Sequence, residues 1–169
     1  MRELSPGACW LARLAGYSRP TVTRHPWLRG PLASIPIGRE WAVVRVPEVA
    51  ADRARAYLAA TEAPTGPVLS ESHVRTFLVH PVLRDGRDIP GGILLTGAHG
   101  ERLNCPMPGG TARLSRFWAV PPDGSGELLD PWLLAGALRA TWAPLPGQVV
   151  AGSRPAHEPL LDERAGVGS

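Results

Sequence analysis

Basic and aromatic residues occur together in the second half of the chain, at Arg102, Arg113, Arg116, Phe117 and Trp118. Guanidinium groups pair with phosphate oxygens, and aromatic rings stack on unpaired bases. This combination therefore fits a surface for single-stranded nucleic acid. Solvated loop arginines beside core aromatics would give the same pattern, so the residue types alone leave both interpretations open.

Three histidines in the middle of the chain, His73, His80 and His99, carry imidazoles that could bind a metal ion. A zinc site needs such ligands at short spacing on one element, beside further ligands in a recognised pattern. The chain lacks that spacing, so we predict no metal site. His99 is the most site-like of the three because it lies in a turn between Gly97 and Gly100, where the backbone can approach a ligand closely. A plain hairpin turn is the simpler interpretation.

The possible nucleophiles show no catalytic pattern. Ser70 and Ser72 lie close to His73 in the sequence, but neither serine is in a nucleophile elbow and no third partner follows at a suitable position. Cys105 precedes Pro106, and a small buried hydrophobic residue explains it better than a reactive thiol does. We therefore predict no catalytic residue among them.

The composition limits the class of protein. A length of 169 residues suffices for one domain with a substantial core. The 18 basic residues are all Arg, and the formal net charge of +3 permits contact with nucleic acid without demanding it. The two cysteines are far apart, and there is no signal-peptide pattern or long apolar run. These features predict a reduced, cytoplasmic protein without a membrane span.

The elements that must position these side chains are short. The stretch Trp41–Val46 is rich in valine, ends at a proline and is followed at once by a helical pattern over Glu48–Ala60. We interpret this pair as the first strand and first crossover of a sheet. Asp130 and Pro131 are an N-cap and a first-turn proline, and they predict a helix that runs to Trp142. Further short strands are expected at 68–70, 76–80, 93–95, 102–105 and 117–120.

These elements predict a single α+β (α/β) domain over residues 35–143. Its sheet is expected to be mixed but mostly antiparallel, with about five to six short strands and two main helices. The strand at 93–95 is expected to be buried. Residues 1–34 are predicted to form a short N-terminal helix and an irregular connector, in which Trp27 and Leu28 pack onto the core. Residues 144–169 are predicted to be a disordered tail.

Four pieces of the chain resemble, in their order and spacing, a group of small actinobacterial proteins. These proteins are similar to the N-terminal domain of bifunctional DNA primase/polymerases of the archaeo-eukaryotic primase type. The most extensive piece reads Trp-x-Val-Pro-Pro-Asp-Gly-Ser-Gly-x-Leu-x-Asp-Pro and precedes a helix. The matching pieces are Gly38–Pro47, Gly66–Leu69, Phe77–Pro81 and Trp118–Leu138. The resemblance covers roughly two thirds of the chain, from about Ile35 to Trp142.

The resemblance implies a polymerase fold in which the catalytic positions have changed. Active members of the family hold divalent metal with an acidic pair at the end of an early strand and a further carboxylate before a glycine-rich strand, and they carry a histidine on a strand between the two. Aligned on the proline that ends the strand, this chain has Arg45 and Pro47 in place of the acidic pair. Arg75 takes the place of the histidine, with His73 two residues away, and Leu95 takes the place of the later carboxylate. The resemblance thus implies the fold and argues against the activity.

The leading hypothesis is a degenerate primase/polymerase-like domain without metal-binding carboxylates or a cofactor, acting as a non-catalytic binding or accessory module. Its expected partner is single-stranded DNA or a replication protein. The residues expected to contact nucleic acid or nucleotide are Arg75, His73, His99, Arg102, Arg113 and Arg116. Two alternatives stay open, a protein-interaction module with no nucleic-acid role and an active nucleotidyltransferase with relocated acidic residues. Those acids would be Glu71, Asp85, Asp88 and Glu101.

Overall fold

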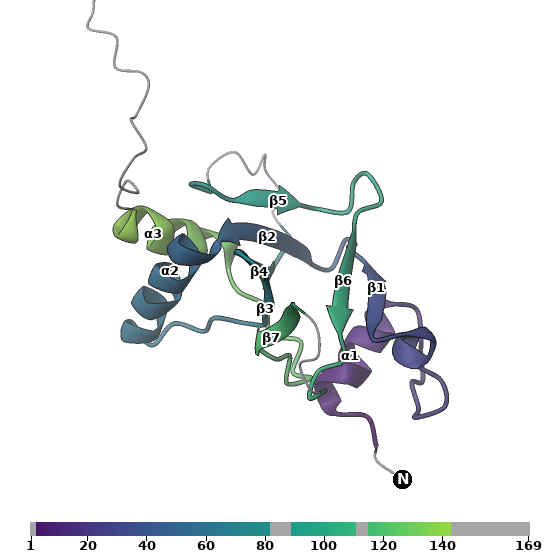
Figure 1. Cartoon of the computed structure of the whole chain (residues 1–169). Coiled ribbons are helices and arrows are strands. Elements are labelled where there is room, and N and C mark those ends of the chain that lie inside the picture. The colour runs from purple at the N-terminus through teal and green to yellow at the C-terminus, as the bar shows by residue number, and fades with distance from the viewer. Residues whose placement is uncertain (1–2, 82–88, 111–114, 143–169) are drawn as a thin grey trace, which may run out of the picture.

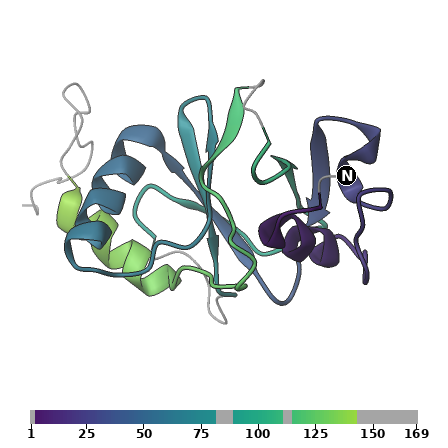
Figure 2. The ribbon, with the colours of Figure 1, turned by 90° about the horizontal axis from the view of Figure 1, so that it is seen from below.

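The chain folds into three layers around a five-stranded antiparallel sheet (Figures 1 and 2). The structure, a computed structural model, describes residues 3–81, 89–110 and 115–142. Helices α2 (Glu48–Ala60) and α3 (Pro131–Thr141) cover one face of the sheet. Helix α1 (Pro6–Leu14) and a second, two-stranded sheet lie over the other face. The predicted α+β class is confirmed.

The central sheet has the strand order β5-β2-β4-β3-β7, and each neighbouring pair is antiparallel. Strands β2 and β3 therefore run in the same direction, with β4 between them and α2 as the crossover, which makes a split β-α-β unit. Strand β4 follows β3 through a tight hairpin. The strands are β2 (Ala42–Pro47), β3 (Val68–Glu71), β4 (Val74–Val79), β5 (Ile93–Leu95) and β7 (Arg116–Val120).

The second sheet pairs β1 (Leu32–Pro36) with β6 (Arg102–Pro106). The prediction of an irregular connector up to residue 34 is therefore wrong at its end, because Ala33 and Ile35 are buried at alternate positions of a strand. The connector also contains a single 3₁₀ turn, η1 (Pro26–Arg29). Trp27 in this turn packs onto the core as predicted and donates from its indole Nε1 to the Cys105 carbonyl oxygen at 2.9 Å. Leu28 is 55% exposed, so its predicted burial is wrong.

Alternation along the strands produces two separate hydrophobic clusters. Val44, Val46 and Phe77 face α2 and α3, while Val43 and Leu78 face α1 and the second sheet. Successive strand residues point to opposite faces, so each strand contributes to both clusters. The same alternation sends the polar residues of β2, β3 and β4 to two different faces, and this separation determines where a site can form.

The two main helices begin at signals that are visible in the sequence. The Asp130 side chain accepts a hydrogen bond from the Trp132 backbone N–H at 2.8 Å and caps α3. Helix α2 begins directly after β2, with Glu48 in its first turn, where a carboxylate suits the helix dipole. Its residues Ala51, Ala54 and Leu58 form the buried stripe that contacts the sheet.

Two further expectations concern exposure and the chain end. The strand at 93–95 exists, but it lies at the sheet edge with Ile93 63% exposed, so the expected burial is wrong. An edge strand has a neighbour on one side only, which leaves more of its surface in water. The predicted tail at 144–169 lies outside the described residues. Within the described ranges, no helix combines the length and apolar character needed to cross a membrane.

Candidate anion-binding cleft

A cavity of about 150 Å³ lies between the central sheet and the two-stranded sheet. Three arginines from three different strands line it: Arg45 of β2, Arg102 of β6 and Arg116 of β7. Only one acidic residue, Glu71 at the end of β3, is among its described lining residues. We call this cavity the arginine cleft. Its lining carries more positive than negative charge, which favours an anion.

Glu71 is held by both neighbouring arginines. Its side chain is nearly buried, and its Oε1 lies 2.8 Å from Arg116 Nε. Its Oε2 lies 3.5 Å from Arg45 and accepts a hydrogen bond from the Thr76 hydroxyl at 2.9 Å. Strand register produces this arrangement, because Glu71 is paired with Arg116 across β3 and β7. The carboxylate therefore occupies the place next to these guanidinium groups that an external anion would seek.

The arginines keep donors available beyond Glu71. Arg45 Nε is buried and, among the described residues, has no hydrogen-bond partner. That nitrogen is closed to solvent, but the Arg45 side chain as a whole is 42% exposed, so the guanidinium can still pair with an external anion such as phosphate. Arg116 also donates to the Asn104 carbonyl oxygen at 3.1 Å, and Arg102 donates to the Ser34 hydroxyl and carbonyl oxygens, both at 2.8 Å. These bonds fix two of the guanidinium groups at the rim.

The opposite face of the same strands carries a second charged cluster, centred on Arg75. This side chain is 11% exposed and donates to the Ser70 hydroxyl at 2.8 Å. It also pairs with the carboxylates of Glu48 and Asp52 on α2. Here two acids and a hydroxyl surround one arginine, so its hydrogen-bonding capacity is used within the protein. The predicted role of Arg75 as a nucleic-acid contact has no support from this placement, because the side chain is turned toward α2.

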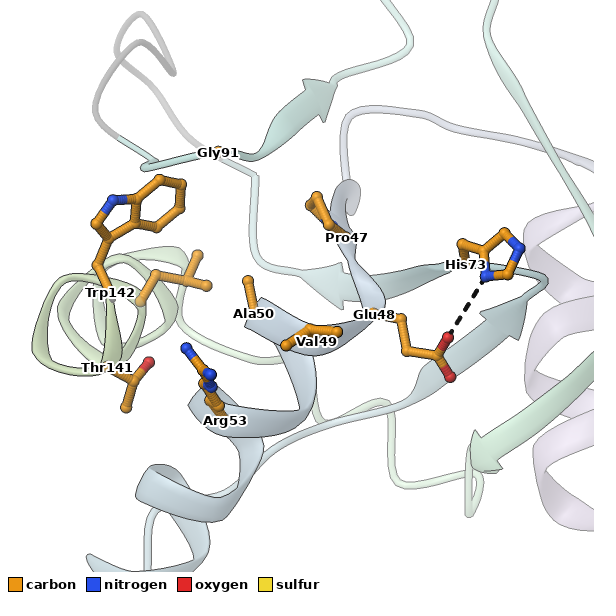
Figure 3. A pocket seen from close by; sticks show the side chains of 10 residues that line it. Pro47, Glu48, Val49, Ala50, Arg53, His73, Gly91, Thr141 and Trp142 are labelled. Carbon is orange, nitrogen blue, oxygen red and sulfur yellow. Dashed lines mark ion pairs between the residues drawn. The ribbon is translucent and has the colours of Figure 1, made fainter. Parts of the chain in front are cut away.

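The other predicted contact residues are dispersed. Arg102 and Arg116 meet in the arginine cleft, whereas His73 lies at the tip of the β3–β4 hairpin with its side chain 97% exposed. His73 Nδ1 lies 3.8 Å from Glu48 Oε2, and Figure 3 marks this contact with a dashed line. His99 is in an exposed turn, and its backbone N–H donates to Glu101 Oε2 at 3.1 Å. Arg113 lies outside the described residues.

The aromatic neighbours of Arg116 do not share its surface. Phe117 follows Arg116 on β7 and therefore points to the opposite face of the sheet. Trp118 returns to the cleft side, but its indole Nε1 donates to the Pro106 carbonyl oxygen at 2.8 Å and its ring packs in the core there. The sequence pattern of arginine beside two aromatics thus does not form one stacking surface.

The surroundings of Glu71, Glu101 and Cys105 show how these candidate acids and this candidate nucleophile are placed. Both oxygens of Glu71 contact cleft donors, and the bond from the His99 backbone lowers the pKa of the Glu101 carboxyl. Asp85 and Asp88 lie outside the described residues. Cys105 is buried, as predicted, and burial raises the pKa of its thiol to about 12. Among the residues that the structure describes, no group of three His, Cys, Asp or Glu side chains could hold a metal ion.

Arg45 is the member of the cleft that the sequence did not identify as a contact residue. The signal in the sequence is its place as the one charged residue within a strand of valines, since a charge there must find a partner or a water-filled cavity.

No family model matches the chain, and neither a curated protein nor a solved structure matches it.

Proposed function

We propose that this protein is a non-catalytic binding module that holds phosphate groups of single-stranded nucleic acid in the arginine cleft. The observation that carries the proposal is the charge ratio of the cleft, which among the described residues is lined by three arginines, Arg45, Arg102 and Arg116, and by one acidic residue, Glu71. Phosphate contacts by arginine supply most of the sequence-independent affinity for nucleic acid. The Arg45 side chain stays 42% exposed beside Glu71, which leaves it accessible to a phosphate oxygen.

The resemblance to primase/polymerase domains supports the same surface. That resemblance places metal-binding carboxylates at Arg45, Pro47 and Leu95. Arg45 and Leu95 line the arginine cleft, whereas Pro47 is not among its lining residues. Two residues from separate parts of the chain thus meet where the resemblance expects one site. Exchange of an acid for an arginine there replaces a ligand for a cation with a ligand for an anion. We therefore propose a degenerate primase/polymerase-like domain in which the former metal site binds phosphate directly.

The test is a fluorescence anisotropy titration of a labelled oligothymidylate at several salt concentrations. We expect the wild-type chain to bind, with an affinity that falls as salt rises. The Arg45→Gln/Arg116→Gln double variant should bind at least about 10-fold more weakly, and its salt dependence should be shallower by about 0.7 for each lost phosphate contact on a single strand. Circular dichroism would verify that the variant is folded.

Arg39→Gln is the matched control, because Arg39 is exposed and outside the cleft lining. It removes one positive charge, whereas the double variant removes two, and it should change the affinity by less than about twofold. Absence of salt-dependent binding by the wild-type chain, or an equal loss in Arg39→Gln, would contradict the proposal. The first outcome would leave the protein-interaction module as the better interpretation.

A further inference from the structure

A second and larger pocket lies on the helix side of the sheet, away from the arginine cleft. Its volume is about 380 Å³, within the range of pockets that hold small organic molecules. Its walls are the start of α2 and the end of α3, closed above by Gly91 (Figure 3). The apolar part of the lining consists of Pro47, Val49, Ala50, Leu138 and Trp142.

Trp142 gives this pocket a flat aromatic wall. The residue is 51% exposed, although a large apolar ring usually gains stability from burial. Its position is constrained by Gly91, where an added Cβ would lie 2.7 Å from the indole ring. Val49 is likewise 50% exposed on the other side of the pocket. The two surfaces leave a slot with apolar walls that suits a planar ring.

The two charged groups at the pocket, Glu48 and Arg53, differ in whether they are paired within the protein. Glu48 is already paired with Arg75 and lies near His73. Arg53 extends from α2 toward the space beside Trp142 and Thr141, as Figure 3 shows. Within the described ranges, no hydrogen bond or ion pair to the Arg53 guanidinium occurs. The pocket therefore combines a satisfied acid, an available cation and an aromatic wall.

We infer that this pocket binds a small planar aromatic carboxylate. The ring would stack on Trp142 against Val49, and the carboxylate would accept hydrogen bonds from Arg53, which presents a planar pair of donors suited to a carboxylate. A neutral arene would use the walls but gain no charge-assisted hydrogen bond from Arg53. An aromatic cation would meet Arg53 as a like charge. The inference is independent of nucleic-acid binding in the arginine cleft.

The test uses naphthalene-2-carboxylate as the probe and isothermal titration calorimetry on the full chain. We expect the wild-type chain to bind the carboxylate about 10-fold more tightly than the neutral isostere 2-naphthalenemethanol, as one charge-assisted contact allows. Arg53→Gln should remove this preference while the alcohol binds as before. Trp142→Ala should weaken both probes, and Arg39→Gln should change neither.

Several results would overturn the inference. One is absence of carboxylate binding by the wild-type chain at millimolar probe, and another is equal affinity for the alcohol. A preference that survives in Arg53→Gln would have the same meaning. Dimerisation that depends on protein concentration and disappears in Trp142→Ala would assign the pocket to a second copy of the chain. Both variants alter exposed side chains, and circular dichroism separates loss of binding from loss of folding.

Discussion

The two faces of the central sheet stabilise a largely buried charged residue with opposite arrangements of partners. On the helix face, Arg75 is surrounded by Glu48, Asp52 and Ser70. On the other face, Glu71 is surrounded by Arg45, Arg116 and Thr76. Ser70 and Glu71 are neighbours on β3, and Arg75 and Thr76 are neighbours on β4, so this strand pair contributes residues to both clusters.

The difference separates a structural cluster from a binding cluster. An arginine enclosed by acids has its donors satisfied and contributes to stability when the partners stay in place. When one carboxylate is enclosed by two arginines, the guanidinium groups have more N–H donors than the carboxylate can accept. The cluster therefore keeps a net attraction for anions. Burial of a charged residue is therefore a poor guide to function by itself, whereas the ratio of donors to acceptors around it is informative.

The largest expected effect concerns the helix face. Arg75→Met should lower the free energy of unfolding by about 2 to 3 kcal/mol, because it leaves two carboxylates on α2 without their buried partner. The figure is at the low end for such pairs since both acids are partly exposed. Urea unfolding measures it. Arg55→Met is the matched control, since Arg55 pairs with Asp52 at 3.7 Å near the surface and should cost less than about 1 kcal/mol.

The same variant also tests oligonucleotide binding. Arg75→Met should leave the affinity for the oligothymidylate unchanged as long as the protein is folded, because the Arg75 side chain is turned away from the arginine cleft. A loss of affinity as large as that of the Arg45→Gln/Arg116→Gln variant would remove the distinction between the two faces.

The next effect concerns Cys105 in the layer that covers the cleft face. Its thiol pKa is raised from an ordinary value of 9.0 to about 12, so the folded state favours the neutral thiol. The resulting stability is fully present below pH 9 and is lost as the pH rises toward 12. At pH 10 the loss should be about 1.4 kcal/mol. Unfolding in urea at pH 8 and pH 10 should show this extra loss in the wild-type chain and not in Cys105→Ala; equal losses would mean that the layer is open to water.

The smallest effect concerns Glu71 itself. Glu71→Gln should strengthen binding of the oligothymidylate about fivefold, because it removes the internal competitor for Arg45 and Arg116 while keeping a hydrogen-bond acceptor. Anisotropy titration at low salt measures the change. Glu48→Gln is the control, since it removes the same charge on the helix face and should leave the affinity as it is. Weaker binding by Glu71→Gln would show that the carboxylate organises the arginines more than it competes with a ligand.

Local signals predicted the elements, while non-local pairing decided the site. The bounds of α2 follow from a proline and a helical period, and the Asp130–Pro131 start of α3 follows from capping. Strand β1 was missed because its alternation is only a few residues long and lies between prolines. The sequence places Arg116 beside Phe117 and so suggests one shared surface, but the pleat of β7 sends the two side chains to opposite faces.

The arginine cleft depends on the strand order, which no short stretch of sequence contains. Arg45, Glu71 and Arg116 come from three strands and meet because β4 is inserted between β2 and β3 and because β7 adds to the edge. Alternation alone could predict that Arg45 lies on the face of Val43. It could not predict that Arg102 would arrive over the same face from a second sheet.

The pairing of β1 with β6 has a consequence for how the molecule is made. It joins Leu32 to Pro106 and Pro36 to Arg102, residues about 70 positions apart. Closing such a loop costs entropy that only the completed contact repays, and contacts of this kind slow folding. The β3–β4 hairpin and helix α2 of the central layers, by contrast, are local in sequence. We therefore expect the arginine cleft to mature late in folding, so that the chain acquires its scaffold before its binding surface.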